Sequence, residues 1–244
     1  MTTTALVTGS TSGIGRATAE MLAARGMHVV VSGRDAARGD DVVRAIRAAG
    51  GSADFVRADL RDQASAAELA AEALRIGDGH VDVLVNSAGI FPFGPTSETT
   101  ADGFDAVYDI NVKAPYVLVA ALAPGMAERG TGSIVNVTTM VAEFGAAGMG
   151  LYGSTKAALV LLTKSWAAEF GPAGVRVNAV SPGPTRTEGT AAMGEALDQL
   201  AAAGPAGRPG TADEVAEAIV FLATDGASFV HGAVLPVDGG RIAV

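Results

Sequence analysis

Short apolar runs recur along the chain and are separated by longer stretches rich in alanine, arginine and glutamate. The runs are nearly continuous in valine, isoleucine and leucine, a pattern typical of strands that are covered on both faces. We predict strands at residues 4–8, 27–32, 53–57, 81–86, 133–138, 175–180 and 233–237. The intervening stretches, such as 14–25, 36–49 and 64–76, predict helices.

Regular alternation of strand and helix predicts an α/β fold with a doubly wound, parallel, seven-stranded sheet and helices on both faces. No repeat, low-complexity tract or linker divides the sequence, so we expect a single domain over residues 1–244. Sheets of this kind bind ligands beyond the carboxyl ends of their strands. Candidate functional residues are therefore expected directly after strands.

The composition narrows the classes of partner. Hydrophobic residues make up 49% of the chain and charged residues 18%, and the net charge is −9. An acidic surface repels polyanions, so we expect neither nucleic acid nor anionic membranes as partners. No apolar run approaches the roughly 18 residues of a spanning helix. The start of the sequence has no signal-like basic segment, and a cytoplasmic location is expected.

Metal chemistry is not expected. The chain has no cysteine, which excludes disulfides and thiolate ligands, and its three histidines lie far apart in the sequence: His28, His80 and His231. We predict no metal site.

A glycine-rich turn follows the first predicted strand and precedes a helix. Glycines permit a tight turn and the close approach of backbone to a pyrophosphate, and the helix N-terminus attracts its negative charge. This position predicts a nucleotide site. Its candidate residues are Gly9, Ser10, Thr11, Ser12, Gly13, Ile14 and Gly15.

The end of the second strand bears on which nucleotide binds. An acidic side chain here binds the ribose hydroxyls of NAD, whereas an arginine pairs with the 2′-phosphate of NADP. The sequence has Ser32, Gly33 and Arg34, followed by Asp35. We favour NADP(H) over NAD(H). The alternatives are that Arg34 is a solvated loop cation or that Asp35 complicates the choice.

Tyr152 and Lys156 stand four residues apart, which places them on one face of a helix. A free tyrosine has a pKa of about 10, and a neighbouring ammonium, with the positive charge of an oxidised nicotinamide, lowers it by favouring the phenolate. Such a tyrosine serves as general acid for carbonyl reduction and as general base for alcohol oxidation. The alternative is a surface tyrosine and lysine that lie one turn apart by chance.

Four motifs occur in order: T-G-x-x-x-G-x-G at 8–15, N-x-A-G at 86–89, Y-x-x-x-K at 152–156 and P-G-x-x-x-T at 182–187. In this the chain resembles the short-chain dehydrogenase/reductase family from Thr8 to Gly240. The resemblance implies a Rossmann-type fold and an oxidoreductase that interconverts a carbonyl and a secondary alcohol by hydride transfer from a nicotinamide.

The resemblance also implies roles for individual residues. Thr139 stands where the family has a serine that hydrogen-bonds the substrate oxygen, and Asn111 matches the asparagine that holds a water linking the lysine to solvent. Gly33 stands where NAD-preferring members carry aspartate. The implied catalytic residues are Asn111, Thr139, Tyr152 and Lys156. The further implied cofactor-binding residues are Asp59, Leu60, Asn86, Ala88, Gly89, Tyr152, Lys156, Pro182, Gly183, Thr185 and Thr187, with Asn86 also supporting the sheet.

The substrate is a small carbonyl or alcohol compound, expected between Phe91, Phe93, residues 141–151 and a lid at about 188–204. Phe144 and Met149 form either an apolar wall there or part of the core. The resemblance to 3-oxoacyl-carrier-protein reductases favours a 3-oxoacyl thioester, for which Arg129 and Arg176 offer a local basic patch on an acidic chain. The alternatives are a small-ketone, sugar or steroid dehydrogenase, or a catalytically idle NADP-binding sensor.

Residues 157–162 and 166–168 are apolar almost all round the predicted helix. Such a helix is buried on every side, either in the core or against another subunit. The family resemblance implies a homotetramer assembled through this helix and its predecessor, with a second interface near the last strand.

Overall fold

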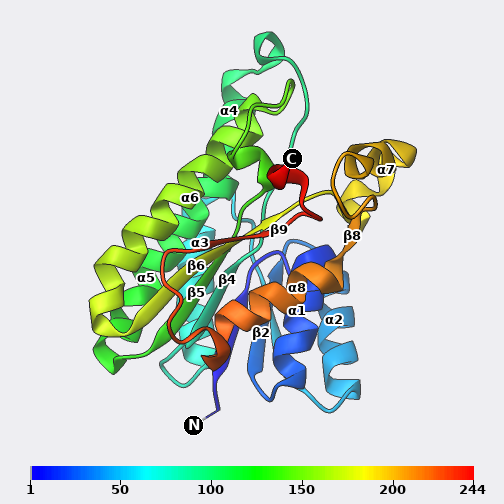
Figure 1. Ribbon diagram of the computed structural model, residues 1–244. Helices are drawn as coiled ribbons and strands as arrows, with labels where there is room; N and C mark the ends of the chain where they lie inside the picture. The colour runs from blue at the N-terminus through cyan, green and yellow to red at the C-terminus, as the bar shows by residue number, and fades with distance from the viewer. Residues whose placement is uncertain (1) are drawn as a thin grey trace.

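The computed structural model describes residues 2–244, and its centre is one parallel sheet of seven strands in the order β3-β2-β1-β4-β5-β6-β9 (Figure 1). This confirms the predicted fold class. The strands are β1 Thr4–Val7, β2 His28–Gly33, β3 Ser52–Arg57, β4 Val83–Asn86, β5 Gly132–Val137, β6 Val175–Pro182 and β9 Val234–Val237. The strand order reverses at β1, whose neighbours are β2 and β4, so the switch point of the sheet lies there.

Helices cover both faces of the sheet (Figure 1). Residues of α1, α2 and α8 pack on one face, and residues of α3, α5 and α6 pack on the other. The helices are α1 Gly13–Ala24, α2 Ala36–Ala48, α3 Gln63–Ile76, α4 Ala101–Tyr108, α5 Ala114–Arg129, α6 Gly150–Phe170, α7 Glu195–Ala202 and α8 Ala212–Ala223.

Successive residues of the central strands enter opposite cores. Ala5 and Val7 of β1 belong to the core under α1 and α8, whereas Leu6 between them belongs to the core under α3 and α5. All three side chains are fully buried. Side chains alternate across a strand, so a strand covered on both faces must be apolar at every position. This is why continuous apolar runs located the strands.

The strand ends differ from the predicted ones by one or two residues. β4 begins at Val83 rather than at residue 81, and β6 continues to Pro182. A short pairing that was not predicted joins β7 Thr185–Arg186 to β8 Gly210–Thr211. This pairing ties the segment after β6 to the start of α8.

One helical stretch, residues 101–129, is long and apolar enough to cross a membrane by length and composition, and half of its most apolar window is buried inside the chain. It comprises α4, a π-helical turn at Asp109–Lys113 and α5. Leu118, Leu122 and Met126 of α5 are buried in the core against the sheet. The stretch is therefore a core helix.

Candidate active site

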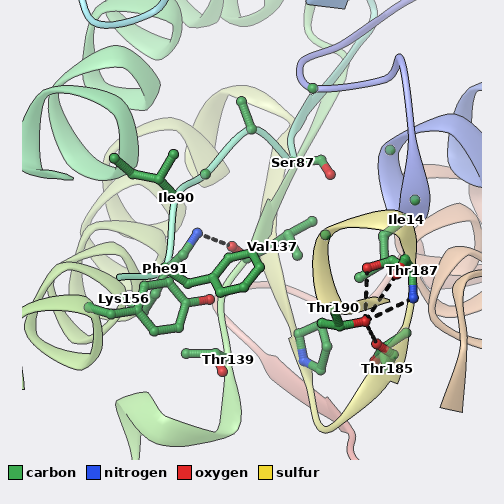
Figure 2. Close-up of a pocket in the computed structure, with 18 of the residues that line it drawn as sticks. Ile14, Ser87, Ile90, Phe91, Val137, Thr139, Lys156, Thr185, Thr187 and Thr190 are labelled. Atoms are coloured by element: carbon green, nitrogen blue, oxygen red, sulfur yellow. Dashed lines mark hydrogen bonds between the residues drawn. The ribbon is translucent and has the colours of Figure 1, made fainter. Parts of the chain in front are cut away.

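A cavity of about 1360 Å³ opens beyond the carboxyl ends of the strands. The turns that follow β1, β2, β3, β4, β5 and β6 all contribute to its lining, together with residues of α6 and α7. In Figure 2, Phe91, Thr139 and Lys156 lie at one side of this cavity, and Thr185, Thr187 and Thr190 lie at the other. The cavity sits at the switch point, where ligands of doubly wound sheets bind.

The glycine turn after β1 brings backbone against backbone. Gly9 has a φ of +65°, and a Cβ there would lie 2.8 Å from the Cα of Ala88. A Cβ at Gly15 would lie 2.5 Å from the carbonyl oxygen of Gly9. Neither position has room for a side chain, so the turn keeps bare backbone facing the cavity.

The N-terminus of α1 is open to an anion. Ser12 is the N-cap, but its side chain makes no capping hydrogen bond. The N–H of Gly13 instead donates to the carboxylate of Glu188 at 2.9 Å. A negatively charged oxygen therefore already occupies the end of this helix, where N–H groups and the helix dipole favour it. The residues fit the pyrophosphate of a dinucleotide, which would compete with Glu188 for the N–H of Gly13.

Ser10 and Asn86 do not line the cavity, contrary to the prediction that they contact the cofactor. The Ser10 hydroxyl donates to the carbonyl of Val7 at 2.7 Å and accepts from the N–H of Ser32 at 2.9 Å. The Asn86 amide donates to the Asn136 side chain at 2.8 Å. Both side chains are buried and hold strands together, which for Asn86 agrees with its predicted support of the sheet.

Thr8 has a positioning role that was not predicted. Its hydroxyl oxygen accepts from the N–H groups of Ser87 and Ala88, each at 3.1 Å. It donates in turn to the carbonyl of Val85 at 3.3 Å. One side chain thereby fixes the turn after β4 against the glycine turn after β1.

Ser32, Gly33 and Arg34 line the far end of the cavity, and Arg38 and Arg57 join them there. Asp35 is engaged elsewhere, because its carboxylate caps α2 through the N–H of Arg38 at 3.1 Å and pairs with the Arg38 guanidinium at 3.6 Å. Arg34 is exposed and makes no ion pair with any residue from 2 to 244. This end of the cavity therefore carries excess positive charge.

A side chain at Gly33 would meet Thr11. Its Cβ would lie 2.6 Å from Cγ2 and 2.9 Å from Oγ1 of Thr11, which is short and β-branched. Position 33 therefore favours glycine, and an aspartate there would have to displace Thr11. Asp59 and Leu60 also line this end, and the Asp59 carboxylate accepts from Arg61 Nε at 3.0 Å. That hydrogen bond holds the pKa of Asp59 below its usual range.

Tyr152 and Lys156 face the cavity from the first turns of α6. Lys156 Nζ lies 5.9 Å from the centre of the Tyr152 ring and donates to the carbonyl of Val137 at 2.8 Å. The Thr139 hydroxyl, two residues after the end of β5, acts on the phenol and lowers the pKa of Tyr152. Two separate elements thus bring a hydroxyl, a phenol and an ammonium to one point, as the sequence predicted.

Burial governs the protonation of these groups. It raises the pKa of Tyr152 to about 12, while the hydrogen bond from Thr139 acts in the opposite direction. Burial also lowers the pKa of Lys156 to about 8. In the chain by itself, desolvation of the phenolate outweighs the effect of Thr139 on the pKa of Tyr152. The lowering of this pKa by Lys156 and the nicotinamide charge together stays a prediction. Tyr152 holds its proton at neutral pH.

Asn111 lies in the π-helical turn and is fully buried. Its amide nitrogen donates to the carbonyl of Ile90 at 2.9 Å and to the hydroxyl of Thr155 at 3.0 Å, and its oxygen accepts from the N–H of Ile90 at 3.0 Å. These bonds occupy the side chain. Asn111 therefore fixes the loop after β4 against α6.

The turn after β6 supplies Pro182, Gly183, Thr185 and Thr187 to the lining. A Cβ at Gly183 would lie 2.6 Å from the Cα of Asp238, so this turn is pressed against the end of β9. Thr190 was not predicted as a site residue. Its hydroxyl donates to the carbonyl of Thr185 at 2.7 Å and accepts from the N–H of Thr187 at 3.0 Å, which sets the shape of this turn (Figure 2).

The substrate end of the cavity is largely apolar. Phe91 packs against Tyr152 with ring centres 6.1 Å apart, and both Phe144 and Met149 line the cavity, as the sequence interpretation allowed. Its lining also includes Phe93, Val141, Met193, Leu197, Leu200 and Arg241. Met193, Leu197 and Leu200 belong to the predicted lid, and Arg241 was not predicted.

Arg129 and Arg176 do not form a free basic patch. Arg129 donates to the carbonyl of Val81 at 2.8 Å, and Arg176 donates to the carbonyls of Leu222 and Thr224 at 2.6 and 3.1 Å. Both lie near the amino ends of the strands, opposite the cavity mouth. Among residues 2–244 no cluster of three or more histidine, aspartate or glutamate side chains is placed to hold a metal ion.

Comparisons with known proteins place the chain in a family. A family model described as enoyl-(acyl carrier protein) reductase matches residues 9–241. The cis-4-hydroxycyclohexanecarboxylate dehydrogenase of Sinomonas cyclohexanicum is 43% identical over 98% of this chain and 96% of its own length.

Solved structures are also similar to this chain in sequence and fold. One described as a short chain dehydrogenase/reductase family protein is 52% identical, with a TM-score of 0.91 over 99% of this chain and 98% of the other. A blue fluorescent protein from a metagenomic library, solved in complex with NADPH, is 36% identical, with a TM-score of 0.92 over 98% of this chain and 97% of the other. The chain therefore belongs to the short-chain dehydrogenase/reductase family, whose members are NAD(P)-dependent oxidoreductases acting on alcohol and carbonyl groups.

Proposed function

We propose that this enzyme is an NADP(H)-dependent reductase that converts a carbonyl to a secondary alcohol, with Tyr152 as the general acid. The observation that carries the proposal is the meeting of Tyr152, Thr139 and Lys156 in the same cavity as the glycine turn. A catalytically idle sensor would not need these three side chains together.

The protonation states support the reductive direction. The bound nicotinamide supplies the hydride. Thr139 and Tyr152 hydrogen-bond the substrate oxygen from the end of β5 and from α6, which fixes the carbonyl in register. Tyr152 is protonated at neutral pH, because its pKa is about 12, and it donates its proton to that oxygen. Lys156, with a pKa of about 8, is charged at pH 7 and stabilises the phenolate that remains. In the reverse direction the phenolate accepts the proton.

Different residues of the cavity would hold the cofactor and the substrate. Backbone N–H groups of the glycine turn and of α1 would hold the pyrophosphate, and Asp59 and Leu60 would meet the adenine. The turn after β6, with Thr185 and Thr187, would hold the nicotinamide amide, and Lys156 would bind the nicotinamide ribose. We place the lid at about residues 188–204, over the junction of the two sites.

The preference for NADP(H) rests on charge at the far end of the cavity. Arg34 has no ionic partner among residues 2–244, whereas Asp35 is occupied by α2 and Arg38. A carboxylate at position 33, which would bind the ribose hydroxyls of NAD, is replaced by Gly33 beside Thr11. The 2′-phosphate of NADP(H), placed beside Arg34, would form an ion pair with its guanidinium.

A compact ketone or alcohol is the favoured substrate. The substrate end of the cavity is lined by aromatic and aliphatic side chains, and a relative that is 43% identical acts, by its name, on cis-4-hydroxycyclohexanecarboxylate. A 3-oxoacyl thioester is the second candidate, because a relative from Thermotoga maritima that is 34% identical is named a 3-oxoacyl-(acyl-carrier-protein) reductase. The acidic chain, whose Arg129 and Arg176 are occupied, offers an acidic carrier protein little attraction. Sugar and steroid dehydrogenases remain alternatives of the same chemistry.

A substrate panel tests this proposal. NADPH and NADH oxidation would be followed with 4-oxocyclohexanecarboxylate, cyclohexanone, a 3-oxoacyl thioester, a keto-sugar and a steroid ketone. Turnover of a cyclic ketone that is faster with NADPH supports the proposal. Turnover of the thioester alone would support carbonyl reduction but contradict a compact ketone as the substrate. Tight NADPH binding without turnover of any carbonyl would favour the catalytically idle sensor. We also propose a cytoplasmic location, which cell fractionation tests.

A further inference from the structure

Arg241 brings a guanidinium to the substrate end of the cavity. It opens a short 3-10 turn, Arg241–Ala243, directly after β9 and lines the same cavity as Tyr152 and Thr139. Its guanidinium lies over the ring of Phe144, 5.4 Å from the ring centre. Figure 1 shows the C-terminal turn at the carboxyl end of the sheet, on the side from which α7 projects.

The backbone around Arg241 is fixed by its neighbours. The carboxylate of Asp238 accepts from the N–H of Gly240 at 2.8 Å and from the N–H of Ile242 at 2.9 Å. The N–H of Arg241 donates to the carbonyl of Asp238 at 3.3 Å. The nearest acidic residue in sequence is thus used to shape the turn, and it makes no ion pair with the guanidinium.

No residue from 2 to 244 satisfies the charge of Arg241. Its Nε is buried and has no hydrogen-bond acceptor, and the side chain makes no ion pair with a carboxylate of the described chain, the C-terminus included. Two other arginines of the cavity, Arg38 and Arg61, pair with carboxylates at its far end. Leaving a buried cationic donor unpaired is unfavourable, so this group is suited to a ligand.

The surroundings favour an anion from the substrate. Apart from residues at the cofactor's adenosine end, the charged residues that line the cavity are Lys156 and Arg241, and no carboxylate accompanies them. Lys156 belongs to the catalytic group beside Tyr152. Arg241 is held at the apolar wall by Phe144, a contact that orients the planar guanidinium.

We propose that Arg241 binds a carboxylate of the substrate, so that the preferred substrates are compact keto and hydroxy acids rather than neutral ketones. The planar guanidinium matches a carboxylate in a two-point hydrogen bond, which orients the molecule as well as attracting it. This inference rests on the proposed function and specifies its substrate class. Arg241 is in this account a specificity-determining residue and takes no part in proton transfer.

A matched pair of substrates tests the proposal. The kcat/KM for 4-oxocyclohexanecarboxylate and for its carboxamide, which has the same shape without the charge, would be measured with NADPH. We expect the wild type to favour the acid by roughly 10–100-fold, since hydrogen bonds between charged groups carry this range. Arg241→Gln should remove most of that preference, because it lowers kcat/KM for the acid much more than kcat/KM for the carboxamide. Arg241→Lys should restore part of it, and Arg25→Gln, remote from the cavity, serves as the control.

Binding separates this inference from the reaction. Calorimetry would follow cis-4-hydroxycyclohexanecarboxylate added to the protein saturated with NADP⁺. Arg241-dependent binding without any turnover would keep the carboxylate site and contradict the proposed reaction. Equal turnover of the acid and the carboxamide, or an unchanged preference for the acid in Arg241→Gln, would contradict the carboxylate site. Neither result would contradict the proposed carbonyl reduction. Failure of the acid to bind or react would also overturn it.

Discussion

Burial disfavours the charged forms of both Lys156 and Tyr152. The pKa of the lysine falls to about 8, and that of the tyrosine rises to about 12. The protein therefore holds an acid that keeps its proton and an amine that is close to losing its own at neutral pH. An arrangement of this kind supports proton donation by the phenol, and it also affects stability.

The stability of the cofactor-free protein should depend on pH through Lys156. Its folded pKa of about 8 lies below the ordinary 10.5, so between these values the unfolded chain binds more protons than the folded one. Stability from this residue then rises with pH. We expect the free energy of unfolding of the wild type to gain about 1–3 kcal/mol relative to Lys156→Met between pH 7 and 9.5.

Chemical denaturation at pH 7, 8, 9 and 9.5 measures this difference. The window stops below pH 10, because the raised pKa of Tyr152 makes stability fall as pH rises from 10 to 12. Parallel pH profiles for wild type and Lys156→Met would show that burial does not shift the lysine.

Arg34 should decide between the two nicotinamide cofactors. Arg34→Ala removes the partner proposed for the 2′-phosphate, so the Kd for NADPH should rise about 10–100-fold while that for NADH changes little. Fluorescence titration measures both constants. Arg44→Ala, on an exposed part of α2 outside the cavity lining, is the control. Equal weakening of NADPH and NADH would contradict the assignment.

At the scale of elements, the turn between β1 and α1 depends on bare backbone. Gly9→Ala forces a side chain into left-handed backbone and against Ala88, whereas Gly50→Ala meets only the left-handed backbone, with nothing within 4 Å of its Cβ. The left-handed conformation alone costs about 1–2 kcal/mol. We expect both variants to lose stability and Gly9→Ala alone to weaken NADPH binding by about tenfold or more.

Thermal unfolding and NADPH titration of the two glycine variants test this. If Gly9→Ala binds NADPH as tightly as Gly50→Ala does, the turn is not in contact with the cofactor, and the dinucleotide must lie elsewhere in the cavity.

The elements were predictable where one physical constraint acts along the sequence. Strands covered on both faces need continuous apolar residues, and the turns that carry glycine at Gly9 and Gly15 have no room for a side chain. Tyr152 and Lys156 were predictable because they stand four residues apart on a helix, whereas Thr139 was assigned through the family resemblance. Their meeting in one cavity needed only the parallel topology.

Other features depend on contacts between distant segments and were not predictable. Ser10 adjoins the glycine turn in sequence, yet its hydroxyl turns inward to join β1 to β2. Asn111 holds the loop after β4 against α6 through hydrogen bonds to Ile90 and Thr155, which lie far away in the sequence. Arg241 reaches the cavity only because β9 closes the sheet beside β6.

At the scale of the whole molecule, apolar residues remain on the outer face. Leu161 of α6 is 65% exposed and Tyr116 of α5 is 53% exposed, whereas Trp166 is 4% exposed. The helix is therefore buried on its inner face within one chain, and burial of its outer face against another subunit stays a prediction. Phe229, before the last strand, is 99% exposed. Exposed apolar side chains at both places favour the homotetramer with two interfaces that the family resemblance implies.

Leu161 should contribute to this assembly. A wild-type mass near four times the 24.3 kDa chain is expected from light scattering, and Leu161→Arg should shift it to a smaller species. Leu200→Arg changes an exposed leucine of the lid instead and should leave the mass unaltered. A wild-type monomer at micromolar concentration would contradict the proposed assembly.

Tyr152→Phe is the decisive variant for the proposed mechanism, in which Tyr152 transfers the proton. NADPH-dependent reduction of the best substrate of the panel would be measured beside NADPH binding, with Tyr116→Phe, whose ring lies outside the cavity lining, as control. We predict that Tyr152→Phe lowers kcat/KM by a factor of about 10²–10⁴ with NADPH binding retained. Turnover of Tyr152→Phe equal to that of Tyr116→Phe would contradict the account.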